Sequence, residues 1–69
     1  MEYAQKYMWR VVAYSWRDKP ILMQEKLPRW VAERVAVRWY QRSDVMRVEG
    51  YNAEERFGLD RVLEQGRRN

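Results

Sequence analysis

The chain has 69 residues, a formal net charge of +4, and neither cysteine nor histidine. A chain of this length builds one small core, so we take residues 1–69 as a single domain with its core in residues 7–52. Without thiols and imidazoles there is no disulfide or zinc–thiolate site, and the commonest catalytic base is excluded, so we expect no cofactor and no metal.

The first two elements are predicted to be strands joined by a hairpin turn. Residues 7–16, YMWRVVAYSW, are rich in β-branched and aromatic side chains. Asp and Pro within residues 17–20 indicate a turn, and residues 21–27, ILMQEKL, alternate as a half-buried strand does. One face of this second strand is predicted to carry Ile21, Met23 and Leu27. The first strand is apolar on both faces, with Tyr14 and Trp16 on the second, so it should be covered on both.

Residues 28–41 are predicted to form an amphipathic helix of about 14 residues, opened by Pro28 at its first position. Its apolar arc consists of Val31, Ala32, Val35, Ala36 and Trp39. Trp30 and Trp39 lie nine residues apart, and at about 100° per residue they point to opposite sides. We therefore expect Trp39 in the core and Trp30 on the outer surface.

Two further elements complete the chain. Residues 45–52, VMRVEGYN, are predicted to form a third strand. Its two faces carry Met46 and Val48 on one side, and Arg47, Glu49 and Tyr51 on the other. Asn52 and Glu55 match a helix capping box, which predicts a C-terminal helix over about residues 53–65, ended by Gly66.

The order ββαβα favours an α+β fold in two layers. A right-handed crossover through the first helix makes the third strand parallel to the second. If the third strand then lies beside the first, the result is a three-stranded antiparallel sheet of order 2-1-3. The amphipathic helix covers one face of this sheet. The other face could be covered by the C-terminal helix, by a second copy of the chain or by a different protein.

An enzyme is not expected. The acidic residues are dispersed at turns and helix ends rather than converging as a catalytic pair would, and the three glycines are isolated. No apolar run approaches a membrane span, and the N-terminus lacks the apolar segment of a secretory signal. We therefore expect a cytoplasmic protein without a membrane partner.

Binding is the function that the composition favours. Residues 29–42 hold four arginines against one glutamate, and the chain contains four tryptophans and five tyrosines. Tryptophan, tyrosine and arginine are enriched at protein interfaces. The predicted partner-binding residues are Trp30, Arg34, Val37, Arg38, Tyr14 and Trp16. The partner is predicted to be another protein or a second copy, as in a homo-oligomer, with nucleic acid as the alternative.

The segment from Trp9 to Asn52, which includes LPRWVAERVAVRW and DVMRVEGY, resembles small ββαβ proteins of actinobacterial phages and related mobile elements. A hairpin, an alanine-rich helix and a closing DV-x-x-V strand recur in such proteins. The resemblance covers about two thirds of the chain. It implies a phage or prophage accessory protein that binds a host factor in the host cytoplasm, and it assigns a role to no particular residue.

Overall fold

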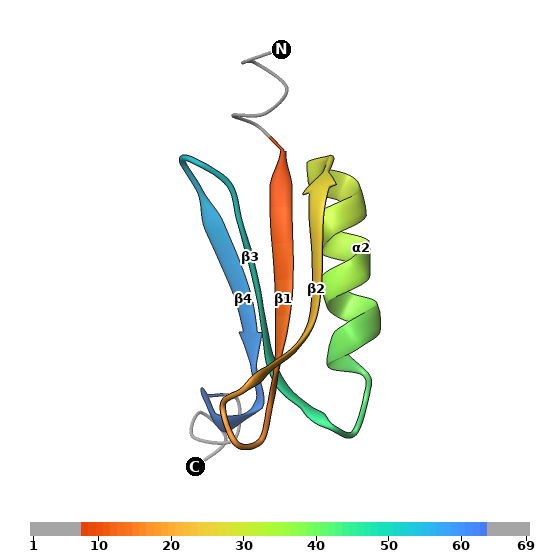
Figure 1. Cartoon of the computed structure of the whole chain (residues 1–69), viewed down its shortest axis with the longest axis vertical. Helices are drawn as coiled ribbons and strands as arrows, with labels where there is room; N and C mark the ends of the chain where they lie inside the picture. Colours follow the sequence, from red (N-terminus) through yellow and green to blue (C-terminus); the bar gives the residue numbers. More distant parts are fainter. Residues whose placement is uncertain (1–7, 64–69) are drawn as a thin grey trace.

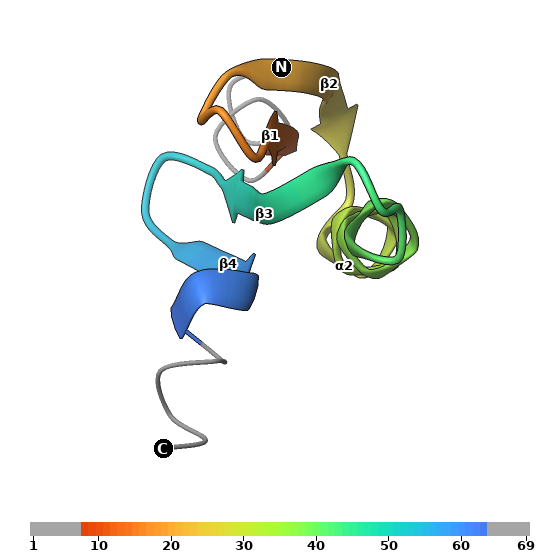
Figure 2. The same cartoon turned by 90° about the horizontal axis from the view of Figure 1, so that it is seen from below.

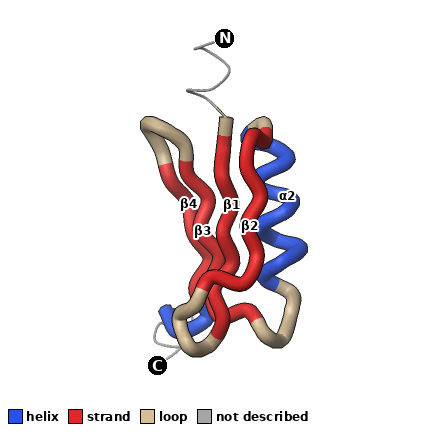
Figure 3. The backbone as a smooth tube through the Cα atoms, viewed as in Figure 1, coloured by secondary structure: helices blue, strands red, loops and turns tan. Residues whose placement is uncertain are grey.

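A computed structural model describes residues 8–63, in which one helix packs on one face of a four-stranded sheet (Figure 1). The elements in chain order are β1 (Trp9–Ser15), β2 (Pro20–Leu27), α2 (Arg29–Tyr40), β3 (Val45–Tyr51) and β4 (Arg56–Asp60). The strands lie in the order β2-β1-β3-β4, and every pair of neighbours is antiparallel (Figure 3). The α+β class and the order of the first three strands are confirmed, and the sheet has a fourth strand.

A turn and the strand Arg56–Asp60 replace the first part of the predicted C-terminal helix, so that prediction is wrong for residues 53–60, and only residues 61–63 of it are helical in the described part of the chain. The Asn52 side-chain oxygen accepts hydrogen bonds from the backbone N–H groups of Glu54 and Glu55, at 2.8 and 2.7 Å, as a helix cap would. The chain nevertheless turns back on itself, because the Asn52 N–H donates to the Glu55 carbonyl oxygen at 3.0 Å. The capping pattern thus closes the β3–β4 hairpin. Gly66, the predicted helix stop, lies outside the described residues.

The β1–β2 hairpin turns as predicted, but its register contains irregularities. Asp18 adopts a φ of 63° in the turn, a conformation that aspartate tolerates better than most residues. Near the other end of β2, Lys26 has a φ of 59° where the register shifts. After this bulge the side chains of β2 point to the opposite faces of the sheet from those expected by simple alternation. Leu27 is therefore buried, while Ile21 and Met23 are exposed. The prediction that these three side chains share one face is wrong for that reason.

The core lies between α2 and the central strands β1 and β3. Figure 2 shows the helix on one side of the curved sheet. Ala32 and Ala36 are the buried residues of α2, and their small side chains let the helix approach the sheet closely. The strand side chains buried in this core include Val11, Ala13, Val45 and Val48. Trp39 packs against the core but is only half-buried, so its predicted central place is taken by the two alanines.

An aromatic pair closes the core near the start of β1. Trp9 is 3% exposed, and its ring centroid lies 5.3 Å from that of Phe57 in β4. Phe57 pairs with Gly50 in β3, and a side chain on Gly50 would collide with the Phe57 ring. The glycine therefore provides the space that the Phe57 ring occupies beside the neighbouring strand.

The second face of the sheet carries a network of charged and aromatic side chains. Arg10 forms an ion pair with Glu25 at 2.8 Å and donates a hydrogen bond to the Tyr51 hydroxyl at 3.3 Å. Beside it, Arg47 forms ion pairs with Asp18 at 2.7 Å and with Glu49. The hydrocarbon parts of such side chains can shield apolar neighbours.

Val12 shows that this shielding is effective. It lies on the second face, between Glu49 in β3 and Met23 in β2, yet it is only 6% exposed. Within residues 8–63 no helix covers this face. We expected a helix or another chain to cover the second face of β1. Part of that cover is provided instead by the polar side chains of the sheet itself.

Candidate protein-binding surface on the helix

The outward face of α2 holds four of the six predicted partner-binding residues. Residues that recur every three to four positions lie in line along a helix. Here they form a continuous stripe, which we call the helix surface, and it consists of Trp30, Arg34, Val37, Arg38 and Gln41. These residues line a shallow groove together with Glu33 and Val35. The helical pattern thus brings Trp30, Arg34, Val37 and Arg38 together on one side of α2.

Two large apolar side chains of the helix surface are open to solvent. Trp30 is 64% exposed and Val37 is 52% exposed. The Arg34 guanidinium carbon lies 6.0 Å from the centre of the Trp30 ring, at the outer limit of a cation–π contact. An exposed tryptophan beside an arginine is a combination enriched at interface hot spots.

The arginine that begins α2 and the one in the loop after it are used within the molecule. Arg29 forms ion pairs with Glu33 at 3.2 Å and Glu55 at 3.0 Å. The pKa of Arg29 is raised above its ordinary value, first by the hydrogen bond to Glu33 and then by the charge of Glu55. Arg42 forms two hydrogen bonds of 3.0 Å with Asp44, which lower the pKa of that carboxyl group.

Arg34 and Arg38 differ from these two arginines. Neither guanidinium forms an ion pair or hydrogen bond with any residue from 8 to 63. Both lie among exposed side chains, between Trp30 and Gln41. The middle of the helix surface therefore presents two uncompensated positive charges beside two apolar side chains.

Tyr14, a predicted partner-binding residue, lies on the second face of the sheet. The Arg47 guanidinium carbon is 3.8 Å from the centre of its ring, so one face of the ring is already occupied. Burial is the main cause that raises the pKa of the Tyr14 phenol, and the charge of Glu49 adds to it. The structure thus separates Tyr14 from the helix surface.

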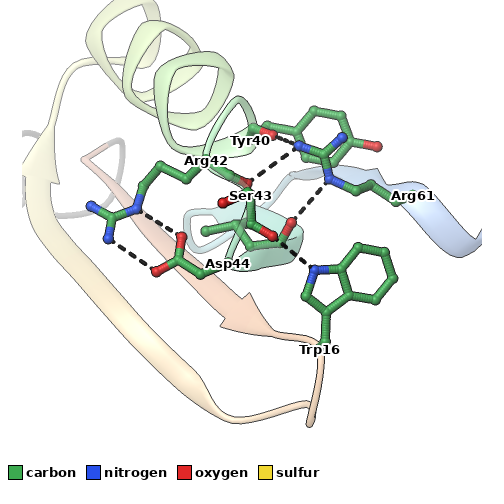
Figure 4. A network of polar contacts seen from close by, with 7 residues as sticks. Trp16, Tyr40, Arg42, Ser43, Asp44 and Arg61 are labelled. Carbon is green, nitrogen blue, oxygen red and sulfur yellow. Dashed lines mark hydrogen bonds and ion pairs between the residues drawn. The ribbon is translucent and has the colours of Figure 1, made fainter.

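Trp16, the remaining predicted partner-binding residue, follows β1 and lies at the end of the molecule where the chain leaves α2. It is 50% exposed, and its indole N–H donates a hydrogen bond of 3.0 Å to the Ser43 carbonyl oxygen (Figure 4). This bond connects the end of β1 to the α2–β3 loop. Trp16 therefore has an intramolecular role and does not join the helix surface.

Arg61 is an important side chain that the sequence did not reveal. It follows β4 and reaches the connection from α2 to β3, where it donates hydrogen bonds to the carbonyl oxygens of Tyr40, Arg42 and Val45, the last at 3.0 Å (Figure 4). Its guanidinium carbon also lies 4.4 Å from the centre of the Tyr40 ring. The last carbonyl groups of a helix have no partner within the helix, and a cation is favoured there.

Comparison with family models, curated proteins and solved structures gave no match. Between residues 8 and 63, no group of three or more acidic side chains is placed to hold a metal ion. In the same stretch, no helix has the length and apolar character needed to cross a membrane.

Proposed function

We propose that this chain is a small non-enzymatic binding module that docks another protein through the helix surface. The partner is an acidic protein segment with apolar side chains, which contacts Trp30 and Val37 and pairs its carboxylates with Arg34 and Arg38. An exposed helix face with apolar and charged side chains at positions i, i+4, i+7 and i+8 is a common form of recognition surface.

The observation that carries this proposal is the imbalance of paired charges. Every carboxylate in residues 8–63 already has a partner within the molecule. Arg34 and Arg38 have no such counterion in the same residues, so the charge left over on the helix is positive. A partner with negative charge neutralises it, and complementary charge of this kind speeds association and selects the partner.

Nucleic acid is the alternative, and the same positive charge favours it. Phosphate binding would use the arginines but not the aliphatic side chain of Val37, which lies between them. Phosphate contacts also add up along a groove, and binding by many of them falls steeply with salt. The helix surface offers only Arg34 and Arg38, so a protein partner uses more of what is exposed.

The resemblance to accessory proteins of actinobacterial phages adds a setting to this proposal. A phage-encoded chain of this size would act on the proteins of its host, in the host cytoplasm. The non-enzymatic part of the proposal is supported by the ion pairs described above, because acids held by arginines at the surface are poor candidates for acid–base chemistry.

The experiment compares three forms of the chain as baits in an actinobacterial lysate treated with nuclease. The forms are the natural chain, the double variant Trp30→Ala/Arg38→Glu, and the control Met23→Ala/Lys19→Glu. The control removes an equally exposed apolar side chain and reverses one charge on a different surface. We expect at least one protein to be retained by the natural chain and the control and to be lost by the helix-surface variant.

Two outcomes would contradict the proposal. If the helix-surface variant retained every protein as well as the natural chain does, the helix surface would not be the binding site. Loss of all retained material on nuclease treatment would favour the nucleic-acid alternative.

A further inference from the structure

The two edges of the sheet differ in how well they are protected. The β2 edge begins with a proline, contains two register shifts and has a residue with positive φ at its far end. These features hinder the addition of another strand. The β4 edge has none of them: it contains no proline, and its pairing with β3 runs without a register shift.

The β3–β4 hairpin determines which backbone groups of β4 face β3 and which face the free edge. Because the Asn52 N–H donates to the Glu55 carbonyl oxygen, Tyr51 and Arg56 form a non-hydrogen-bonded pair. Pairs then alternate along the ladder, so Phe57 and Leu59 direct their backbone groups to β3. The N–H and C=O groups of Arg56, Gly58 and Asp60 point the other way, toward the free edge.

We infer that β4 pairs with β4 of a second copy, in antiparallel orientation about a two-fold axis at Gly58. In this register Gly58 faces Gly58 of the second copy, and Arg56 faces the partner's Asp60. All the outward backbone groups then form hydrogen-bonded pairs with their equivalents across the axis. Two four-stranded sheets thereby become one continuous sheet, with both α2 helices on the same face.

The side chains of β4 are self-complementary in this register. On the second face, each Arg56 lies directly across from an Asp60, so opposite charges meet at both ends of the paired strands. On the helix face, Phe57 lies across from the partner's Leu59, in a non-hydrogen-bonded pair whose side chains approach closely. Both of these apolar side chains are only half-buried in the single chain. Any other register would bring Arg56 or Asp60 opposite a different residue.

The proposed strand pairing explains why residue 58 is a glycine. Within a single chain it has no positive φ, and an added Cβ would meet only the Val48 carbonyl oxygen at 3.5 Å, which is ordinary contact. The fold of one chain therefore does not require glycine there. A glycine within a strand often marks a place where another backbone approaches closely, and the centre of the proposed strand pair is such a place.

The inference goes beyond the proposed function and uses a different surface. The helix surface lies on α2, whereas the paired edge lies on β4, beyond β3 from the helix's main contacts with β1 and β3. Either proposal can therefore fail without affecting the other.

The test measures self-association by sedimentation for three samples: Arg56→Asp alone, Asp60→Arg alone, and their equimolar mixture. The natural chain should form a dimer of twice 8.6 kDa as concentration rises. Each single variant places like charges opposite each other twice, so its dimer should be weaker by about tenfold or more. The mixture restores opposite charges at both positions, so it should recover a dimer that contains one copy of each variant.

The control is Arg38→Asp, which makes the same change of charge on the helix surface and should leave the dimer unchanged. A second measurement needs no variant: the amide protons of Arg56, Gly58 and Asp60 should exchange more slowly as concentration rises, while exposed amides of the helix do not change. A natural chain that stays at 8.6 kDa at millimolar concentration would overturn the inference. So would a dimer equally strong in both single variants, or concentration-independent exchange at those three amides.

Discussion

Gly50 and Gly58 lie on neighbouring strands, but a methyl group added at each would meet different surroundings. At Gly50 the new Cβ would lie 2.9 Å from Phe57 Cε1 and closer still to the next ring atoms. The ring would have to move, and its contact with Trp9 would be lost or strained. Gly50→Ala should therefore lower the free energy of unfolding by about 1 to 3 kcal/mol, the range for overpacking in a core.

Gly58→Ala is the matched control for this prediction. Because its Cβ would make only ordinary contact, it should stay within about 0.5 kcal/mol of the natural chain. Urea unfolding followed by circular dichroism, at a protein concentration low enough to keep the chain monomeric, measures both. Equal losses for the two variants would show that the Phe57 ring does not rest on Gly50.

The residues of the helix surface could be found from sequence because they follow one regular period. Trp30 and Arg34 are fixed on the outer side as soon as the chain is known to be helical. Arg61 could not be found in this way. It contacts Val45 and Tyr40, residues distant along the chain, and nothing in its own neighbourhood indicates that pairing.

At the scale of the elements, the end of α2 depends on Arg61. Arg61→Ala leaves the carbonyl oxygens of Tyr40 and Val45 without this donor, so it should cost about 1 to 3 kcal/mol of stability. Arg61→Lys should recover only part of this loss, since one ammonium group cannot reach several carbonyls as a planar guanidinium does.

Thermal melts measure this effect, with Arg17→Ala as the control. Arg17 is exposed and its side chain forms no hydrogen bond or ion pair with residues 8–63, so the control should change stability by less than about 0.5 kcal/mol. Hydrogen exchange should also show faster opening of the last turn of α2 in Arg61→Ala. An Arg61→Ala chain as stable as the control would contradict the capping role.

The elements themselves were predictable where local pattern and global fold agree. The β-branched run of β1 and the apolar arc of α2 both indicated the correct element. The error came at β4, where Asn52 makes the hydrogen bonds of a helix cap but serves a hairpin turn. The alternation of Phe57, Gly58 and Leu59 was the strand signal, and it is too short to outweigh a capping box.

At the scale of the whole molecule, the four tryptophans fall into different environments. Trp9 is 3% exposed and Trp30 is 64% exposed, with Trp16 and Trp39 between them. Trp9→Ala should cost about 3 to 5 kcal/mol, the range for removing a large aromatic side chain from a core. Since a domain of this size has little more stability than that, the variant should be largely unfolded.

Trp30→Ala is the counterpart on the surface. It should stay within about 0.5 kcal/mol of the natural chain, and its binding to the retained partner should weaken by about 2 kcal/mol or more if Trp30 is a hot spot. Thermal melts and a binding assay on both variants separate stability from binding. If Trp30→Ala unfolded the chain, Trp30 would have to lie in the core. The helix α2 would then be rotated about its axis relative to the structure described here.

The second face of the sheet is the whole-molecule feature that sequence reasoning described least well. Its apolar members, such as Val12, were expected to need a second layer. The covering layer is made by Arg10, Arg47 and their acidic partners, and these pairs join residues from β1, β2, β3 and the first turn. Such pairing depends on the finished strand order, so a linear pattern cannot predict it.

The Asn52 turn has a consequence for the order in which the sheet assembles. Residues 52–55 make the same side-chain bonds at the start of a helix or of a hairpin, so this stretch alone does not select β4. Pairing with β3 selects the strand, and because a two-stranded hairpin is at best marginally stable alone, this pairing becomes stable once β3 has joined β1. The sheet should therefore grow outward from its centre, and β4 should be the last strand to form and the first to detach.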